Sequence, residues 1–151
     1  MRTDPALPRH FDWQFQSDLR RVSEIAAAIG RLIARTPAWA DRQEEVELVS
    51  AELLTNLSRH AYGGTAGPID LTMTLAPSFL RLRSEDRGRP FRAPDAKPPA
   101  ENPNSSGTET LREGGFGLSI IHEIADTVSY ARNGQRNIWT LTLVRERAKA
   151  G

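Results

Sequence analysis

The sequence predicts an α+β fold, a two-layer sandwich of a mostly antiparallel, mixed sheet with three helices on one face. Three observations predict it: five segments alternate apolar and polar residues, four of these form two hairpins, and the helical segments are grouped. A chain of 151 residues suits a single domain with one core. We therefore expect residues 1–151 to fold as one domain.

The first strand and the first helix follow each other at the start of the chain. Apolar and polar residues alternate from Phe11 to Phe15, which is typical of a half-buried strand. Ser17 is the expected N-cap of a helix whose apolar residues recur every three or four positions from Leu19 to Ile33. This periodicity gives the helix one apolar face.

A second helix is predicted from Asp41, as its N-cap, through Ala61, and Gly63-Gly64 ends it. Two hairpins follow at different points of the chain. One joins strands at 69–75 and 79–84 across Pro77-Ser78, and the other joins 127–132 and 137–144 across Asn133-Gly134. A third helix opens at Gly114 and carries an apolar face from Leu118 to Ile124.

The segment 92–113 differs in composition from the rest of the chain. It holds four prolines and has no apolar periodicity. A structureless stretch of this length inside a compact domain is usually a functional lid or a disordered insert. Both interpretations stay open from composition alone.

Composition excludes several classes of function. Cysteine is absent, so the chain has neither disulfides nor a thiolate zinc site. Lys and Arg (20) nearly balance Asp and Glu (19), and no basic stripe favours direct nucleic-acid binding. Neither a secretion signal nor an apolar stretch of the ~20 residues needed to cross a bilayer is present. We expect a cytoplasmic protein without membrane contact.

Glu52 and Asn56 lie one turn apart on the second helix, at the edge of its buried stripe. A side-chain amide oxygen is a hard ligand of the kind that Mg²⁺ prefers, and a nearby glutamate can take a proton from an attacking hydroxyl. An ordinary solvated helix surface is the competing interpretation. His60, one turn further, is expected to be structural.

Asp86 ends the second strand of the first hairpin and is followed by Arg87 and Gly88. A carboxylate beside a glycine can accept a hydrogen bond from the exocyclic amino group of adenine, because glycine lets the ring approach the backbone. The alternative is a simple turn, since Asp and Gly are common turn residues. The sequence favours neither interpretation.

Gly114-Gly115-Phe116-Gly117 opens the third helix. Glycines allow successive N–H groups to point at an anion, and a helix N-terminus adds positive potential. A hinge with a helix boundary is the alternative. The segment matches neither the lysine-bearing phosphate loop nor the dinucleotide-binding fingerprint.

Taken together, three segments resemble the N, G1 and G2 boxes of the GHKL ATP-binding superfamily: E-L-L-T-N-L-S-R-H-A-Y, E-D-R-G-R-P-F and G-G-F-G-L-S-I-I. The motifs N-x-x-x-H-A-Y and D-R-G-R-P-F are similar to those of the bacterial anti-sigma-factor serine/threonine kinases of partner-switching systems. The resemblance spans about 11–144, nearly the whole chain.

This resemblance implies roles for the residues. Asn56 would hold Mg²⁺ against the ATP phosphates, Glu52 would be the catalytic base, and Asp86 would bind the adenine amino group. Gly115 and Gly117 would lie along the phosphates beneath a lid at about 92–113. The nucleotide-binding set that it implies is Asn56, Asp86, Gly88, Arg112, Gly115, Phe116, Gly117 and Leu118. The implied partners are a sigma factor, a STAS-domain antagonist and a second copy of the chain.

One position departs from that pattern. Many relatives carry an arginine directly before the G2 glycines, whereas this chain has Glu113, with Arg112 one residue earlier. Either Arg112 substitutes or phosphoryl transfer is weakened. Three functions therefore stay open: an anti-sigma kinase, a nucleotide-binding partner-switch module with little or no kinase activity, and a switch kinase acting on a scaffold without a sigma partner.

Overall fold

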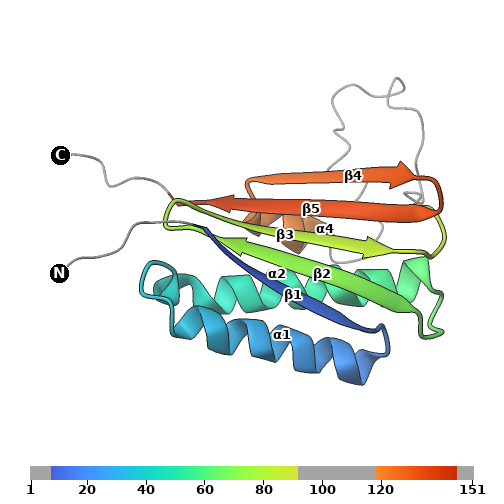
Figure 1. Ribbon diagram of the computed structural model, residues 1–151, viewed down its shortest axis with the longest axis horizontal. Coiled ribbons are helices and arrows are strands. Elements are labelled where there is room, and N and C mark those ends of the chain that lie inside the picture. The colour runs from blue at the N-terminus through green and yellow to red at the C-terminus, as the bar shows by residue number, and fades with distance from the viewer. Residues whose placement is uncertain (1–7, 92–117, 146–151) are drawn as a thin grey trace.

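The computed structural model describes residues 8–91 and 118–145, in which five strands form one sheet. The spatial order is β1 (Arg9–Gln16), β2 (Pro68–Leu75), β3 (Phe79–Asp86), β5 (Arg136–Val144) and β4 (Thr127–Asn133). Each neighbouring pair is antiparallel. The helices α1 (Leu19–Ala34), α2 (Gln43–Asn56) and α4 (Leu118–Ile124) lie on one face of this sheet (Figure 1). The predicted α+β sandwich is confirmed.

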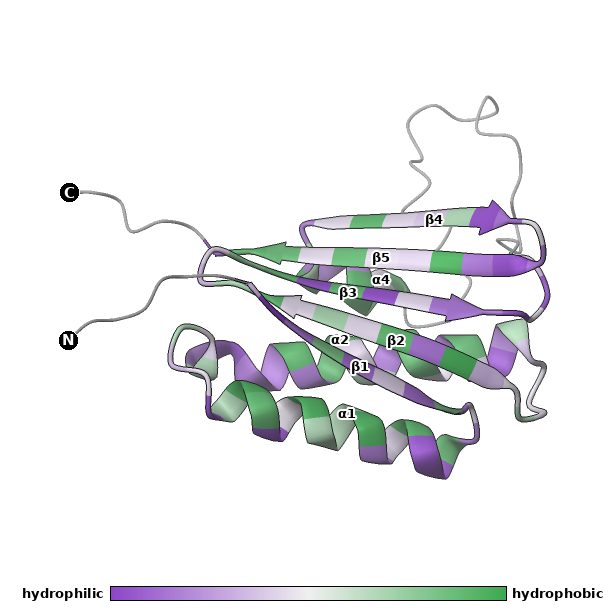
Figure 2. Cartoon of the chain, viewed as in Figure 1, coloured by the Kyte–Doolittle hydropathy of each residue, from purple (hydrophilic) through white to green (hydrophobic). Residues whose placement is uncertain are grey.

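The core lies between the sheet and the helices. Every second side chain of β2 is buried, from Ile69 to Leu75, which is the alternation that predicted the strand. Along α1, hydrophobic and hydrophilic residues recur on opposite sides of the helix, and the buried positions include Val22, Ile29 and Ile33 (Figure 2). Trp39, between α1 and α2, is fully buried, and its Nε1 donates to the carbonyl of Ala76 at 2.7 Å.

Two predicted helix caps are wrong, because each side chain has a distant partner. Asp18 caps α1 by accepting from the backbone N–H of Arg21 at 2.9 Å, whereas the Oγ of the buried Ser17 accepts from the N–H of Gly67 at 3.0 Å. Asp41 sits in a short 3₁₀ turn, η1 (Ala40–Arg42), that precedes α2, and its carboxylate pairs with Arg145 at 2.8 Å.

The end of the second helix is predicted correctly, but its last turn is not α-helical. After Asn56 the chain makes one π-helical turn, η2 (Leu57–Ala61), in which the N–H of Tyr62 bonds to the carbonyl of Leu57 at 3.2 Å. Such a wide turn inside a helix often marks a functional site. It follows directly on one of the predicted site residues.

Both hairpins are confirmed. The first turns between Ala76 and Phe79, whose backbones bond at 2.9 Å, and the second turns at Gly134 with a φ of +66°. The proposed lid at 92–113 lies outside the described residues. In the described part, no helix combines the length and the apolarity that a bilayer span requires.

Candidate functional site

The C-terminal end of α2 carries the first part of the candidate site. Asn56 is 3% exposed, and no hydrogen-bond donor among the described residues reaches its Oδ1. A buried acceptor without a partner costs about 1–3 kcal/mol, so such atoms in folded proteins generally serve a ligand, a water or an ion. Glu52 lies one turn before it on the same helix and is partly buried. The predicted pair therefore stands together at the edge of the core.

The π turn after Asn56 packs against the loop that follows β3. It leaves the carbonyl oxygen of Ala61 free to accept from the N–H of Arg89 at 2.8 Å. Gly88 packs so closely on Ala61 that an added Cβ atom would collide with this carbonyl group. Gly88 is thus needed for the contact between the two backbones, a reason that the sequence interpretation did not include.

Asp86 ends β3, as predicted, and its two carboxylate oxygens have different surroundings. Its Oδ1 accepts from the N–H of Gly88 at 2.8 Å and from Nδ2 of Asn137 at 2.7 Å. Its Oδ2 is buried and meets no donor among the described residues. The turn and the ligand interpretations of this aspartate are therefore compatible, because the turn occupies one oxygen and leaves the other.

Burial also affects the ionisation of Asp86. The side chain is 1% exposed, and this desolvation raises the pKa of its carboxyl group above the usual 3.8. The hydrogen bonds from Asn137 and Gly88, together with the charge of Arg132, act in the opposite direction. A ligand donor at Oδ2 would add to these opposing effects and favour the carboxylate.

Asn137 is a site residue that the sequence interpretation missed. It is 1% exposed, and besides Asp86 its Nδ2 donates to the carbonyl of Arg89 at 2.8 Å. Its Oδ1 accepts from the hydroxyl of Tyr130 at 2.6 Å and from Arg132 at 2.9 Å. Asn137 lies directly across from Asp86 in the sheet, so a signal exists only once the pairing of β3 with β5 is known.

An aromatic cluster supports the same end of the sheet. The rings of Phe91, Tyr130 and Trp139 lie with their centroids 5.0 to 5.5 Å apart. The hydroxyl of Tyr130 accepts from the N–H of Phe91 at 2.9 Å while it donates to Asn137. Packing and hydrogen bonding thus fix the chain that follows Gly88.

The remaining predicted site residues have different outcomes. Leu118 begins α4 and is fully buried. Arg112, Gly115, Phe116 and Gly117 lie outside the described residues, so their roles stay predictions. His60 is partly buried, and burial, followed by the charges of Arg59 and Arg89, lowers its pKa. In the described part of the chain no cluster of three His, Asp or Glu residues can hold a metal ion.

Comparisons with known proteins match most of the chain. The family model described as a histidine kinase-like ATPase domain matches residues 15–143. A serine-protein kinase RsbW of Staphylococcus epidermidis is 26% identical over 132 residues, which are 83% of this chain and 81% of the relative. The serine-protein kinase RsbW of Staphylococcus aureus strain MSSA476 is 28% identical over 120 residues, which are 75% of this chain and 74% of the relative.

A solved structure is also similar. It is the histidine kinase domain of the blue-light activated histidine kinase from Erythrobacter litoralis EL346, with a TM-score of 0.47 and 21% identity over 83% of this chain. The present chain spans 60% of the length of that chain.

Proposed function

The chain belongs to the histidine kinase-like ATPase domain family, and from this premise we propose that it is an ATP-dependent serine/threonine protein kinase that acts as an anti-sigma factor. It sequesters a sigma factor in the cytoplasm and phosphorylates a STAS-domain antagonist. The observation that carries the nucleotide part is a pair of buried oxygens that meet no donor among the described residues, Oδ1 of Asn56 and Oδ2 of Asp86. They lie on two element ends that the contact of Gly88 with Ala61 joins.

Asp86 suits the adenine base. Its Oδ2 is an acceptor only, so it pairs with the exocyclic amino group of adenine and repels the carbonyl oxygen that guanine has in the same place. Asn137 and Gly88 hold the other oxygen and thereby fix the orientation of the carboxylate. Ionisation of Asp86 strengthens this hydrogen bond, because bonds to charged acceptors are the stronger ones.

Asn56 suits Mg²⁺, and Glu52 suits proton transfer. The unpartnered amide oxygen of Asn56 is a hard donor of the kind that Mg²⁺ takes alongside phosphate oxygens and water. Bound Mg²⁺ would neutralise charge on the phosphates. Glu52 accepts the proton of the substrate hydroxyl as the oxygen of that group bonds to the γ-phosphorus and ADP leaves. The segment 92–113 is proposed as the lid of this single domain, and Arg112, Gly115, Phe116 and Gly117 as phosphate contacts.

The two partners are proposed from the resemblance to the anti-sigma-factor kinases, and the relatives named serine-protein kinase RsbW support the kinase part. A phosphate adds roughly −1.5 to −2 charges at pH 7 and three acceptor oxygens, so phosphorylation of the antagonist can dissolve its complex with the kinase. The kinase is then free to hold the sigma factor. This exchange is the partner switch.

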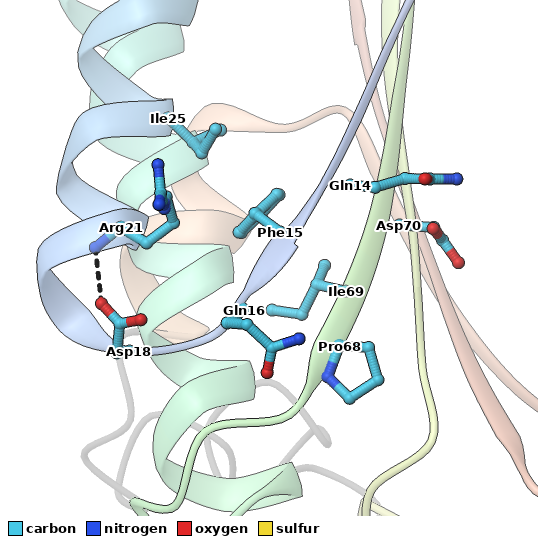
Figure 3. A pocket seen from close by; sticks show the side chains of 9 residues that line it. All are labelled: Gln14, Phe15, Gln16, Asp18, Arg21, Ile25, Pro68, Ile69 and Asp70. Atoms are coloured by element: carbon cyan, nitrogen blue, oxygen red, sulfur yellow. Dashed lines mark hydrogen bonds between the residues drawn. The ribbon is translucent and has the colours of Figure 1, made fainter.

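A second copy of the chain is proposed to bind along β1 and α1. Strand β1 is at the edge of the described sheet, and unpaired edges readily pair with another chain. Beside it, a groove of about 610 Å³ opens between β1 and α1, with Phe15 and Ile25 pointing into it (Figure 3). Sedimentation velocity tests this: the wild-type protein should be dimeric and Ile25→Lys monomeric.

One position favours a second candidate function. Glu113 stands where many relatives have an arginine that reaches the terminal phosphate, which favours a nucleotide-controlled binding module with little phosphoryl transfer. A switch kinase that acts on a scaffold without a sigma partner is the third possibility. The three differ in what is bound and what is phosphorylated.

One experiment separates these functions. The tagged protein is used to recover partners from the native cell with ATP or ADP, and the phosphorylated sites of the recovered proteins are mapped. A sigma factor with a phosphorylated STAS partner supports the proposal, and a sigma factor with an unphosphorylated partner supports the module. Recovery of a phosphorylated scaffold without any sigma factor supports the third function.

A variant of the proposed catalytic base, Glu52, provides the enzymatic test. Glu52→Ala should keep ATP affinity and lose transfer from labelled ATP, because only the proton acceptor is removed. Glu44→Ala is the matched control, since this exposed glutamate lies in the first turn of the same helix. Full transfer by Glu52→Ala contradicts the base role.

A further inference from the structure

A basic groove lies beside the candidate site, between the end of η2, the loop after β3 and the β4–β5 turn. It has a volume of about 750 Å³, and the arginines that line it are Arg87, Arg89 and Arg132. All three are exposed, and among the described residues no carboxylate lines the groove with them. We propose that this basic groove binds an acidic segment of a partner protein. This interaction goes beyond the proposed kinase function and needs no nucleotide.

The positive charge of the basic groove is not neutralised within the described part of the chain. None of its three arginines forms an ion pair there, whereas arginines elsewhere do: Arg21, Arg42, Arg83, Arg136 and Arg145. Arg132 interacts electrostatically with the buried carboxylate of Asp86, but it forms no ion pair with it, because the donors to Oδ1 are the uncharged Gly88 and Asn137. Burial is the main cause that lowers the pKa of His60, and the charges of Arg59 and Arg89 lower it further.

The backbone that carries these arginines is held in place before any partner binds. The N–H of Arg87 donates to the hydroxyl of Tyr62 at 2.8 Å, and the N–H of Arg89 donates to Ala61 at 2.8 Å. The side chain of Arg132 donates to the carbonyl of Gly88 at 3.0 Å. Preorganisation of this kind lowers the entropic cost of binding. The backbone at Arg87 and Arg89 and the side chain of Arg132 are therefore fixed before a partner binds.

The surroundings favour a short acidic protein segment over an extended polyanion. Next to the groove, a smaller cavity is lined by three acidic residues, Asp70, Glu85 and Asp86, together with Arg87 and Arg136. A nucleic acid that continued past the arginines would meet these carboxylates, and the whole chain has a net charge of only +1. Guanidinium groups bind carboxylates in a two-pronged geometry, so aspartate and glutamate side chains are suitable ligands.

The test uses a short fluorescein-labelled peptide of alternating aspartate and serine, with an asparagine–serine peptide as the uncharged probe. Fluorescence anisotropy of the full chain without nucleotide should show binding of the acidic peptide alone, weakening as salt is raised. Arg87→Gln with Arg89→Gln should weaken binding about tenfold, which corresponds to about 1.4 kcal/mol for the two exposed ion pairs that are lost. Within the described residues the side chains of Arg87 and Arg89 form no hydrogen bond, whereas that of Arg132 donates to Gly88 and Asn137.

The matched control is Arg31→Gln with Arg35→Gln, which removes the same charge from exposed positions at the far end of α1. Equal weakening by both double variants would show that net charge alone acts, and the proposal would be overturned. Displacement of the peptide by ATP, or tighter binding of a single-stranded oligonucleotide, would overturn it as well. Failure of the proposed kinase activity would leave the peptide result unchanged, because the assay contains no nucleotide.

Discussion

Asp86→Asn replaces one oxygen of a buried carboxylate by an amide group and changes little else in size. The retained oxygen can still accept from Gly88 and Asn137, so the turn after β3 is preserved. The new amide donor takes the place of Oδ2, which meets no donor among the described residues. In the proposed complex this donor faces the amino group of adenine, which is also a donor. The substitution therefore reverses the recognition of the base without removing the side chain.

The expected loss of affinity follows from the hydrogen bond that disappears. A bond to a charged acceptor contributes about 1.5–3 kcal/mol, and every 1.4 kcal/mol is tenfold in affinity. ATP should therefore bind Asp86→Asn about 10- to 150-fold more weakly than the wild-type protein. GTP should lose less, because the amide donor can pair with the guanine carbonyl oxygen. The preference for ATP over GTP should therefore shrink.

Isothermal titration calorimetry with ATP and GTP in the presence of Mg²⁺ measures both quantities. Asp70→Asn is the matched control, because Asp70 is an exposed carboxylate on the neighbouring strand. Unchanged ATP affinity in Asp86→Asn would refute the assignment of Oδ2 to adenine. So would an equal loss of ATP and GTP affinity, which would indicate general damage to the site.

The same variant tests the ionisation of Asp86. Because burial raises its pKa above 3.8 in the folded protein, the folded state binds protons more tightly at this group than the unfolded state. The stability that this group contributes is fully present below the unfolded pKa and is lost as the pH rises through the folded pKa. Wild-type protein should therefore lose stability relative to Asp86→Asn as pH rises through that window, measured by urea unfolding. An opposite slope would contradict the raised pKa.

Three further variants test the neighbouring residues. Asn56→Ala should abolish Mg²⁺-ATP binding in calorimetry. It should change the free energy of unfolding by only about 1 kcal/mol, because the deleted oxygen has no partner in the described structure. Unchanged ATP affinity would remove this residue from the site. Gly88→Ala should lower the free energy of unfolding by about 1–3 kcal/mol, because the added Cβ atom collides with the backbone carbonyl of Ala61. A urea midpoint equal to that of the wild-type protein would contradict this close packing. Asn137→Ala should lower ATP affinity together with stability, because it frees the carboxylate of Asp86; a loss of stability with normal ATP affinity would assign it a structural role only.

The elements of the fold could be predicted from the sequence because their signals are local. Alternation along β2 and periodicity along α1 reflect which side chains face the core, and this burial needs no knowledge of the partner. The two wrong caps show the limit. Ser17 is occupied by Gly67, fifty residues away, and Asp41 by Arg145, more than a hundred residues away. Serine and aspartate are both common N-cap residues, but these two side chains are occupied by long-range contacts, so neither caps its helix.

The candidate site divides in the same way. Asn56 and Asp86 could be named from their type, their spacing and their place at the ends of elements. Asn137 could not, because its role depends on the register that sets it opposite Asp86. The structural requirement for glycine at position 88 could not be predicted either, since no sequence pattern indicates the π turn that brings Ala61 against it.

Two oxygens that meet no donor among the described residues, Oδ1 of Asn56 and Oδ2 of Asp86, explain why the site needs so much supporting structure. Each is a buried acceptor whose cost to the free protein is about 1–3 kcal/mol, and a side chain free to rotate would turn that oxygen toward a donor. Asp86 is prevented from doing so by two hydrogen bonds on its other oxygen, one from its own turn and one from Asn137. Tyr130 and Arg132 in turn hold the amide of Asn137. A ligand that donates to Oδ2 therefore finds an acceptor already oriented and already desolvated, and its binding includes relief of the cost that the free protein bears.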